Sequence, residues 1–149
     1  MPMIVRWPSL VKPGTLCHEP VVSMDFYPTF LEVAGIKPTT KKQLDGKSLV
    51  SLFRQNGEFE GRDLFFHFPN YAWHMDNRLG GAVRSGDYKM IRNYDDQSVE
   101  LYNLKLDISE TNNLVKERPQ LAHRLNSKLA TWLEETDALM PRPPNPRAK

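Results

Sequence analysis

The sequence predicts an α/β remnant, the last strand and helices of a mostly parallel sheet domain, followed by a small α+β subdomain. In the subdomain an antiparallel four-stranded sheet is expected to pack on a long C-terminal helix. Three observations carry this prediction: an unbroken apolar run at Met3–Val5, short strand-like runs between residues 64 and 103, and leucines at helical spacing after Pro119. The expected domains are residues 1–57, residues 58–140 and a Pro-rich tail at residues 141–149.

The first predicted helix lies between Ser23 and Gly35. Ser23 is a suitable N-cap, Asp25 places a carboxylate at the positive end of the helix, and Gly35 can take the left-handed conformation that ends it. The residues between them form a wide apolar face, so this helix must pack against other apolar groups. A second, shorter helix is predicted from Lys47 to Gln55.

The run Met3–Val5 is typical of a strand that is covered on both faces, and such a strand needs neighbours for its backbone hydrogen bonds. Only residues 19–22 could pair beside it before the first helix. We therefore expect the chain to be a piece of a longer protein, with the rest of the sheet encoded upstream.

The second half of the chain predicts the antiparallel sheet and its covering helix. The expected strands are residues 64–68, 81–85, 88–94 and 98–103, and Asp95-Asp96-Gln97 joins the last two as a hairpin turn. A helix from Pro119 to Met140 would cover the apolar face of the sheet, with Pro119 in its first turn. Its predicted apolar stripe consists of Leu121, Leu125, Leu129, Trp132, Leu133 and Leu139.

The composition of the chain limits the kinds of partner and site that can be expected. The chain has 20 Lys and Arg against 18 Asp and Glu, and the basic residues are scattered apart from Lys41-Lys42, so no nucleic-acid-binding face is predicted. No apolar run is long enough to span a bilayer, so no membrane partner is predicted. Cys17 is the only cysteine, which excludes an internal disulfide and a Cys-based zinc motif.

Five short motifs occur in a characteristic order. They are Pro2–Pro8, Val22–Gly35 together with Leu44–Leu49, Gly86–Ile91, Glu100–Leu104 and Glu110–Leu114. In this order they resemble the C-terminal portion of a sulfatase, a member of the formylglycine-dependent arylsulfatase family in the alkaline phosphatase superfamily. The resemblance extends from Pro2 to about Met140. One departure is Asp107-Ile108-Ser109-Glu110, where the family usually has Asp-Pro before the Glu.

The resemblance implies that the parent protein hydrolyses a sulfate ester of a carbohydrate or an aryl alcohol. It also implies a formylglycine nucleophile, made from Cys or Ser within Cys/Ser-x-Pro-x-Arg, and a calcium ion, both in a missing N-terminal catalytic domain. No such motif occurs in these 149 residues, and Cys17 is followed by Pro20 one position too late. The chain alone is therefore expected to hold no cofactor and to be inactive. Family members are often exported, but the chain carries no export signal and its compartment is left open.

The segment His67–His74 is the candidate substrate contact. His67, Tyr71, Trp73 and His74 combine neutral donors with aromatic faces, which suit a sulfated sugar or aryl group. The alternative is structural: a locally hydrogen-bonded His67, with Tyr71 and Trp73 in an interdomain core. Arg84 and Lys89 could likewise attract a sulfate, although ordinary surface charge explains them too. A turn explains the adjacent Asp95 and Asp96 more simply than a metal site does.

Two other functions fit the same residues. One is a phosphodiesterase or phosphonate hydrolase of the same superfamily, whose nucleophile and metals would again lie upstream. The other is a non-catalytic module that binds sulfated glycans through the small sheet and the aromatic loop.

Overall fold

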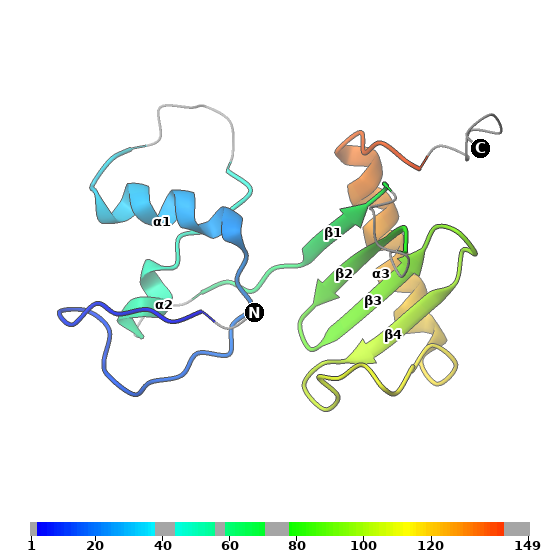
Figure 1. The fold of residues 1–149 in the computed structure, drawn as a ribbon, viewed down its shortest axis with the longest axis horizontal. Coiled ribbons are helices and arrows are strands. Elements are labelled where there is room, and N and C mark those ends of the chain that lie inside the picture. Colours follow the sequence, from blue (N-terminus) through cyan, green and yellow to red (C-terminus); the bar gives the residue numbers. More distant parts are fainter. Residues whose placement is uncertain (1–2, 38–43, 56–58, 71–77, 142–149) are drawn as a thin grey trace, which may run out of the picture. The chain divides into compact units, whose positions relative to one another are not determined.

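The structure is a computed structural model that describes residues 3–37, 44–55, 59–70 and 78–141. The chain divides into two compact units, Met1–Gly61 and Arg62–Lys149, and each is described by itself. Figure 1 shows the helices of the first unit and the sheet with its helix in the second. None of the described helices is long and apolar enough to cross a membrane.

The first unit contains a short 3-10 turn, η1 (Ser23–Asp25), and two helices, α1 (Phe26–Val33) and α2 (Val50–Arg54). Gly35 has φ +66°, which confirms its predicted role after the end of α1. The shorter helix was predicted from Lys47 but begins at Val50, and Gln55 ends it in the left-handed conformation.

Met3–Val5 lies in no strand here, and Ile4 is 94% exposed. The described part of this unit holds no second strand with which it could pair, and the prediction placed its neighbours upstream. The prediction of Ser23 as the N-cap is wrong. Val22 holds the N-cap position of η1 and Asp25 that of α1, and neither of these side chains makes a capping hydrogen bond. The Val22 N–H instead donates to the Asp25 carboxylate at 2.9 Å.

Asp25 and Thr29 attach the segment before α2 to the first helix. Both side chains are buried. The Asp25 carboxylate accepts the backbone N–H of Lys47 at 2.9 Å, and the Thr29 hydroxyl accepts that of Leu49, also at 2.9 Å. The Thr29 hydroxyl itself donates to the backbone carbonyl of Asp25. These bonds explain why the motif around Asp25 and the motif at residues 44–49 occur together.

The second unit contains the predicted antiparallel sheet. Its strands are β1 (Leu64–Phe68), β2 (Gly80–Ser85), β3 (Tyr88–Asn93) and β4 (Val99–Asn103), and they lie in the order β1-β2-β3-β4. All three pairings are antiparallel. The turn between β3 and β4 is confirmed, with Gln97 at φ 58°.

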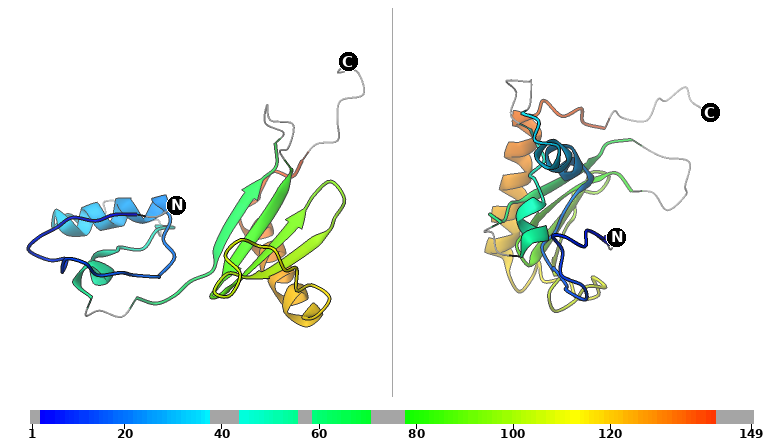
Figure 2. Two further views of the ribbon diagram at one scale, coloured as in Figure 1. Left: turned by 60° about the horizontal axis from the view of Figure 1, so that its bottom comes forward. Right: turned by 90° about the vertical axis from the view of Figure 1, so that its left-hand side faces the viewer.

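Helix α3 (Pro119–Glu135) covers one face of this sheet, as predicted (Figure 2). Pro119 lies in its first turn, as expected. The core between sheet and helix consists of Val83, Met90, Leu101, Ala122, Leu125, Leu129 and Leu133. Trp132 stacks on Phe65 with ring centroids 5.1 Å apart.

The end of the predicted helix is wrong. The helix stops at Glu135, five residues before Met140, and Asp137 then takes the left-handed conformation with φ 49°. Because the chain leaves the helix axis there, Leu139 does not continue the apolar stripe and is 80% exposed.

Candidate functional site

The candidate site is a groove of about 890 Å³ on the face of the sheet opposite α3. Successive side chains of a strand point to opposite faces, so the residues that alternate with the core residues Val83, Met90 and Leu101 must lie on this open face. The register places Phe66, Ala82, Ile91 and Glu100 side by side across the four strands. Arg84, Lys89 and Tyr102 form the neighbouring row.

An ion pair lies at one side of the groove. The Lys89 ammonium group donates to both carboxylate oxygens of Glu110, at 2.7 and 2.8 Å. The two side chains are only 28% and 30% exposed, so solvent screens this pair less than it would an open surface pair. The positive charge of Lys89 is therefore largely neutralised within the chain. Lys89 is one of the two basic residues that could attract a sulfate.

A network of hydrogen bonds between neutral and acidic side chains lies beside the ion pair. The Tyr102 hydroxyl donates to Glu100 Oε2 at 2.7 Å, and the side-chain amide of Asn93 donates to Glu100 Oε1 at 3.2 Å. Burial, followed by the hydrogen bond to Glu100 and its negative charge, raises the pKa of Tyr102 to about 12. Tyr102 therefore stays protonated at physiological pH and remains a donor.

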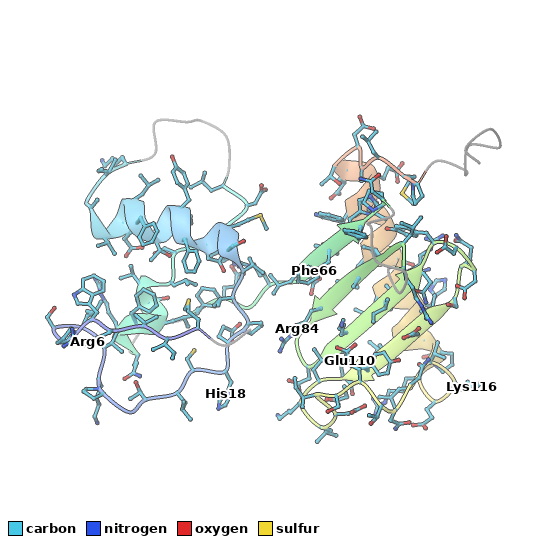
Figure 3. The ribbon with its side chains drawn as sticks, viewed as in Figure 1. Arg6, His18, Phe66, Arg84, Glu110 and Lys116 are labelled. Carbon is cyan, nitrogen blue, oxygen red and sulfur yellow. The ribbon has the colours of Figure 1, made fainter. Side chains whose placement is uncertain are left out.

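Arg84, unlike Lys89, makes no described hydrogen bond to a carboxylate. Its Nε lies 3.5 Å from the Gly86 carbonyl, at the limit of a hydrogen bond. Figure 3 shows Arg84 and Phe66 on the β1–β2 side of the sheet. Arg84 therefore keeps its positive charge available for an acidic group, as its sulfate-attracting prediction requires.

His67 lies on β1, and its ring makes two hydrogen bonds within the chain. Its Nδ1 is 2.7 Å from the Tyr94 hydroxyl, and its Nε2 is 3.0 Å from the backbone carbonyl of Leu139. The neutral tautomer with its proton on Nε2 satisfies both, since Nε2–H donates to the carbonyl and Nδ1 accepts from the hydroxyl. A substrate contact by His67 would have to replace one of these bonds.

The other three predicted contact residues, Tyr71, Trp73 and His74, lie outside the described residues, so their role stays a prediction. The same is true of Lys41-Lys42 and of most of the Pro-rich tail.

The acidic turns are structural. Asp96 accepts the backbone N–H of Ser98 at 2.9 Å, and hydrogen bonds from Ser98 hold the pKa of the Asp96 carboxyl below its ordinary value. The N–H groups of Asn112 and Thr111 likewise lower the pKa of Asp107, which accepts them at 2.8 and 2.9 Å. Within the ranges that the structure describes, no three His, Cys, Asp or Glu side chains gather to hold a metal ion.

Sequence reasoning missed the pairing of Lys89 with Glu110. No local signal gives this pair, because the residues are 21 positions apart and meet through the path of the loop after β4. Glu110 has φ 56°, a conformation that few residues other than glycine adopt.

Comparison with known proteins identifies the chain. A family model described as "N-sulphoglucosamine sulphohydrolase, C-terminal" matches residues 1–138. The chain belongs to this sulfatase family. The resemblance read from the five motifs is thereby confirmed.

Individual relatives of this family agree with the match. A sulfatase of Formosa agariphila is 39% identical over 93% of the chain, and an N-acetylglucosamine-6-O-sulfatase of Bacteroides thetaiotaomicron is 30% identical over 91% of it. The chain covers 28% and 24% of these two proteins, so it spans about a quarter of the length of the sulfatases that it matches.

A solved sulfatase-family structure supports the fold. This structure, of a protein in complex with its substrate D-glucosamine-2-N,6-O-disulfate, matches 91% of the chain with a TM-score of 0.72 and 26% identity. The match covers 28% of that protein.

Proposed function

We propose that this chain is the C-terminal part of an enzyme that hydrolyses sulfate esters of carbohydrates. The observation that carries the proposal is the family match over residues 1–138. The choice of carbohydrate is supported by two relatives, one named as an N-acetylglucosamine-6-O-sulfatase and one solved with a disulfated glucosamine.

In such an enzyme the chain would form scaffold and part of the rim around an active-site pocket built by other residues. Sulfate-ester cleavage needs a strong nucleophile, neutralisation of the sulfate oxygens and help for the leaving oxygen. The residues present lack the Cys/Ser-x-Pro-x-Arg motif that supplies the sulfatase nucleophile. Formylglycine and calcium would therefore belong to a part of the enzyme that precedes this chain, and that part is its principal partner.

Sulfate release tests the proposal. The reading frame should be extended upstream, and the extended protein compared with the 149-residue chain on 6-O- and N-sulfated glucosamine. We expect the extended protein to contain Cys/Ser-x-Pro-x-Arg and to release sulfate, and the short chain to release none. The control is the extended protein with the Cys or Ser of that motif replaced by Ala.

Three results would contradict parts of the proposal. Sulfate release by the 149-residue chain would disprove its inactivity, and an upstream sequence without the motif would disprove the sulfatase assignment. Hydrolysis of a phosphate diester or phosphonate in place of the sulfate ester would favour the related hydrolase of the same superfamily. Binding of sulfated glycan by the short chain, with no activity of the extended protein, would favour the binding module.

The contact residues His67 and His74 give a further prediction. In the extended enzyme, replacing both with Ala should lower kcat/KM for sulfated sugars by about 10- to 100-fold, the loss expected for one or two hydrogen bonds to a charged group. The loss should differ between substrates, because a contact to one sugar position cannot serve all of them equally.

His123→Ala is the matched control, since His123 is exposed on α3. Each single variant should also be measured, because His67→Ala removes the bonds to Tyr94 and Leu139 as well and can act through stability. An unchanged kcat/KM across several sulfated substrates in the double variant would eliminate the contact hypothesis.

A further inference from the structure

The two ring nitrogens of His67 lie in different surroundings. Nδ1 faces the hydroxyl of Tyr94, a side chain that is only 8% exposed. Nε2 faces the backbone carbonyl of Leu139, and that hydrogen bond lies at the surface beside a side chain that is 80% exposed. A ligand can therefore reach Nε2 by displacing an exposed backbone carbonyl, whereas Nδ1 lies behind a buried tyrosine.

Tyr94 reaches His67 across an intervening strand. His67 on β1 is paired with Gly81 on β2, and Tyr94 directly follows the end of β3. A Cβ atom at position 81 would lie only 2.5 Å from the Tyr94 hydroxyl oxygen. A glycine within a strand often marks such a close approach. Any larger residue at position 81 would move the hydroxyl, so the bond between Tyr94 and His67 depends on this glycine.

Tyr94 fixes both the proton and the orientation of the His67 ring. The Leu139 carbonyl can only accept, so Nε2 carries the proton and Nδ1 accepts from the Tyr94 hydroxyl. Burial raises the pKa of Tyr94, so its hydroxyl remains a donor at physiological pH. The two rings also meet edge to face with centroids 5.5 Å apart, which restricts rotation of the imidazole.

The exposed Nε2–H suits an oxygen of a sulfated sugar. Sulfate and hydroxyl oxygens accept hydrogen bonds, as the carbonyl that Nε2 binds here does. We propose that Tyr94 is a positioning residue that holds His67 with its Nε2 proton available to the substrate, and that a substrate oxygen replaces the Leu139 carbonyl on binding. The family match ends at residue 138, so this carbonyl lies just beyond it. The inference rests on the proposed function, because it takes His67 as a substrate contact of a sulfatase.

Steady-state kinetics of the extended enzyme test the role of Tyr94. Tyr94→Phe keeps the ring but removes the hydroxyl, so the imidazole can turn and present either nitrogen. We expect KM for 6-O-sulfated glucosamine to rise about 3- to 10-fold, the range for one neutral hydrogen bond, with kcat unchanged. Gly81→Ala should act in the same direction by moving the hydroxyl. The matched control is Tyr88→Phe, which removes a hydroxyl where β3 pairs with Ser85 and should leave KM unchanged.

Two replacements of His67 separate positioning from stability. Glutamine places an amide nitrogen close to the position of Nε2, whereas asparagine places one close to that of Nδ1. We expect His67→Gln to keep most of kcat/KM and His67→Asn to lose about tenfold. In the His67→Gln background, Tyr94→Phe should change KM by less than about twofold, because the amide carries its donor without help from Tyr94.

Nitrogen NMR of the extended protein, made with isotope-labelled histidine, reads the His67 ring without any need for hydrolysis. The His67→Gln variant lacks the His67 signals and so assigns them. In the wild type we expect a proton on Nε2 and a hydrogen-bonded acceptor at Nδ1, and in Tyr94→Phe the hydrogen-bond shift at Nδ1 should disappear. Adding 6-O-sulfated glucosamine should move the Nε2 signal more than the Nδ1 signal.

Four outcomes would overturn the inference: a proton on Nδ1 in the wild type, an unchanged KM in Tyr94→Phe, an equal loss from Tyr94→Phe in the His67→Gln background, or a glutamine variant no better than the asparagine variant. Sulfate release separates the two proposals. An active enzyme whose Nε2 signal ignores the sugar refutes only the positioning of His67. An extended protein that releases no sulfate, yet whose Nε2 signal moves with the sugar, refutes only the hydrolytic function.

Discussion

Gly46→Ala is expected to destabilise the first unit by about 3 kcal/mol, near the upper end of the cost of overpacking a filled site. A Cβ atom at position 46 would collide with the carbonyl oxygen of Met24 and lie 2.5 Å from its carbonyl carbon and 2.9 Å from the Asp25 nitrogen. These are backbone atoms, which cannot rotate away as the end of a flexible side chain can. The two segments would have to separate, and the next residue, Lys47, donates to buried Asp25.

Urea unfolding measures the loss of stability of the variant. Hydrogen exchange of the Lys47 and Leu49 amides shows whether the loss arises at this contact. Both amides are hydrogen-bonded across the contact, so both should lose protection. The matched control is Gly61→Ala in the same unit, where the new Cβ would come no closer than 3.7 Å to Glu19 Oε1. If the two variants unfold at the same urea concentration, the close approach of residues 24 and 46 is not what holds this unit together.

Leu129→Ala is expected to destabilise the second unit by about 3–4 kcal/mol, the cost of a large cavity in a packed core. Leu129 is fully buried between α3 and the sheet. Gly81 on β2 has no side chain that could fill the space, since its own Cβ position would lie 3.0 Å from Leu129. The cavity would therefore remain open, so the expected cost lies in the middle of the usual range for Leu→Ala substitutions.

Leu139→Ala is the matched control, because the same side chain is removed from a position that is 80% exposed. It should change the free energy of unfolding by less than about 0.5 kcal/mol, as surface substitutions usually do. Urea unfolding with hydrogen exchange of the β3 and β4 amides measures both variants. Equal effects of the two substitutions would mean that the apolar stripe continues past Glu135 after all.

The second unit was predictable because its signals are local. Apolar alternation, the turn at residues 95–97 and the leucines after Pro119 each predict an element from neighbouring residues, and the structure confirms four strands and α3 with small changes at their ends. Met3–Val5 forms no strand in the described residues, because a strand exists only with hydrogen-bonded partners and the prediction placed those partners upstream.

The candidate site was less predictable than the fold. The sequence indicated His67, Arg84 and Lys89 as residues with suitable chemistry, but not what each of them contacts. Lys89 is held by Glu110, and His67 by Tyr94 and Leu139, over separations of 21, 27 and 72 residues. Such pairs depend on how loops return to the sheet, and no local pattern reports that path.

By itself, the sequence determined the small antiparallel sheet, the helix that covers it and the sulfatase family, since periodicity, turn residues and ordered motifs are written along the chain. Only the tertiary structure decided that Asp25 binds the backbone N–H groups of Val22 and Lys47, that Gly46 must be glycine, and that the charge of Lys89 is paired with Glu110. The physical reason is that a side chain's partner is fixed by the packing of segments distant in sequence, whereas the tendency to form a strand or helix comes largely from adjacent residues.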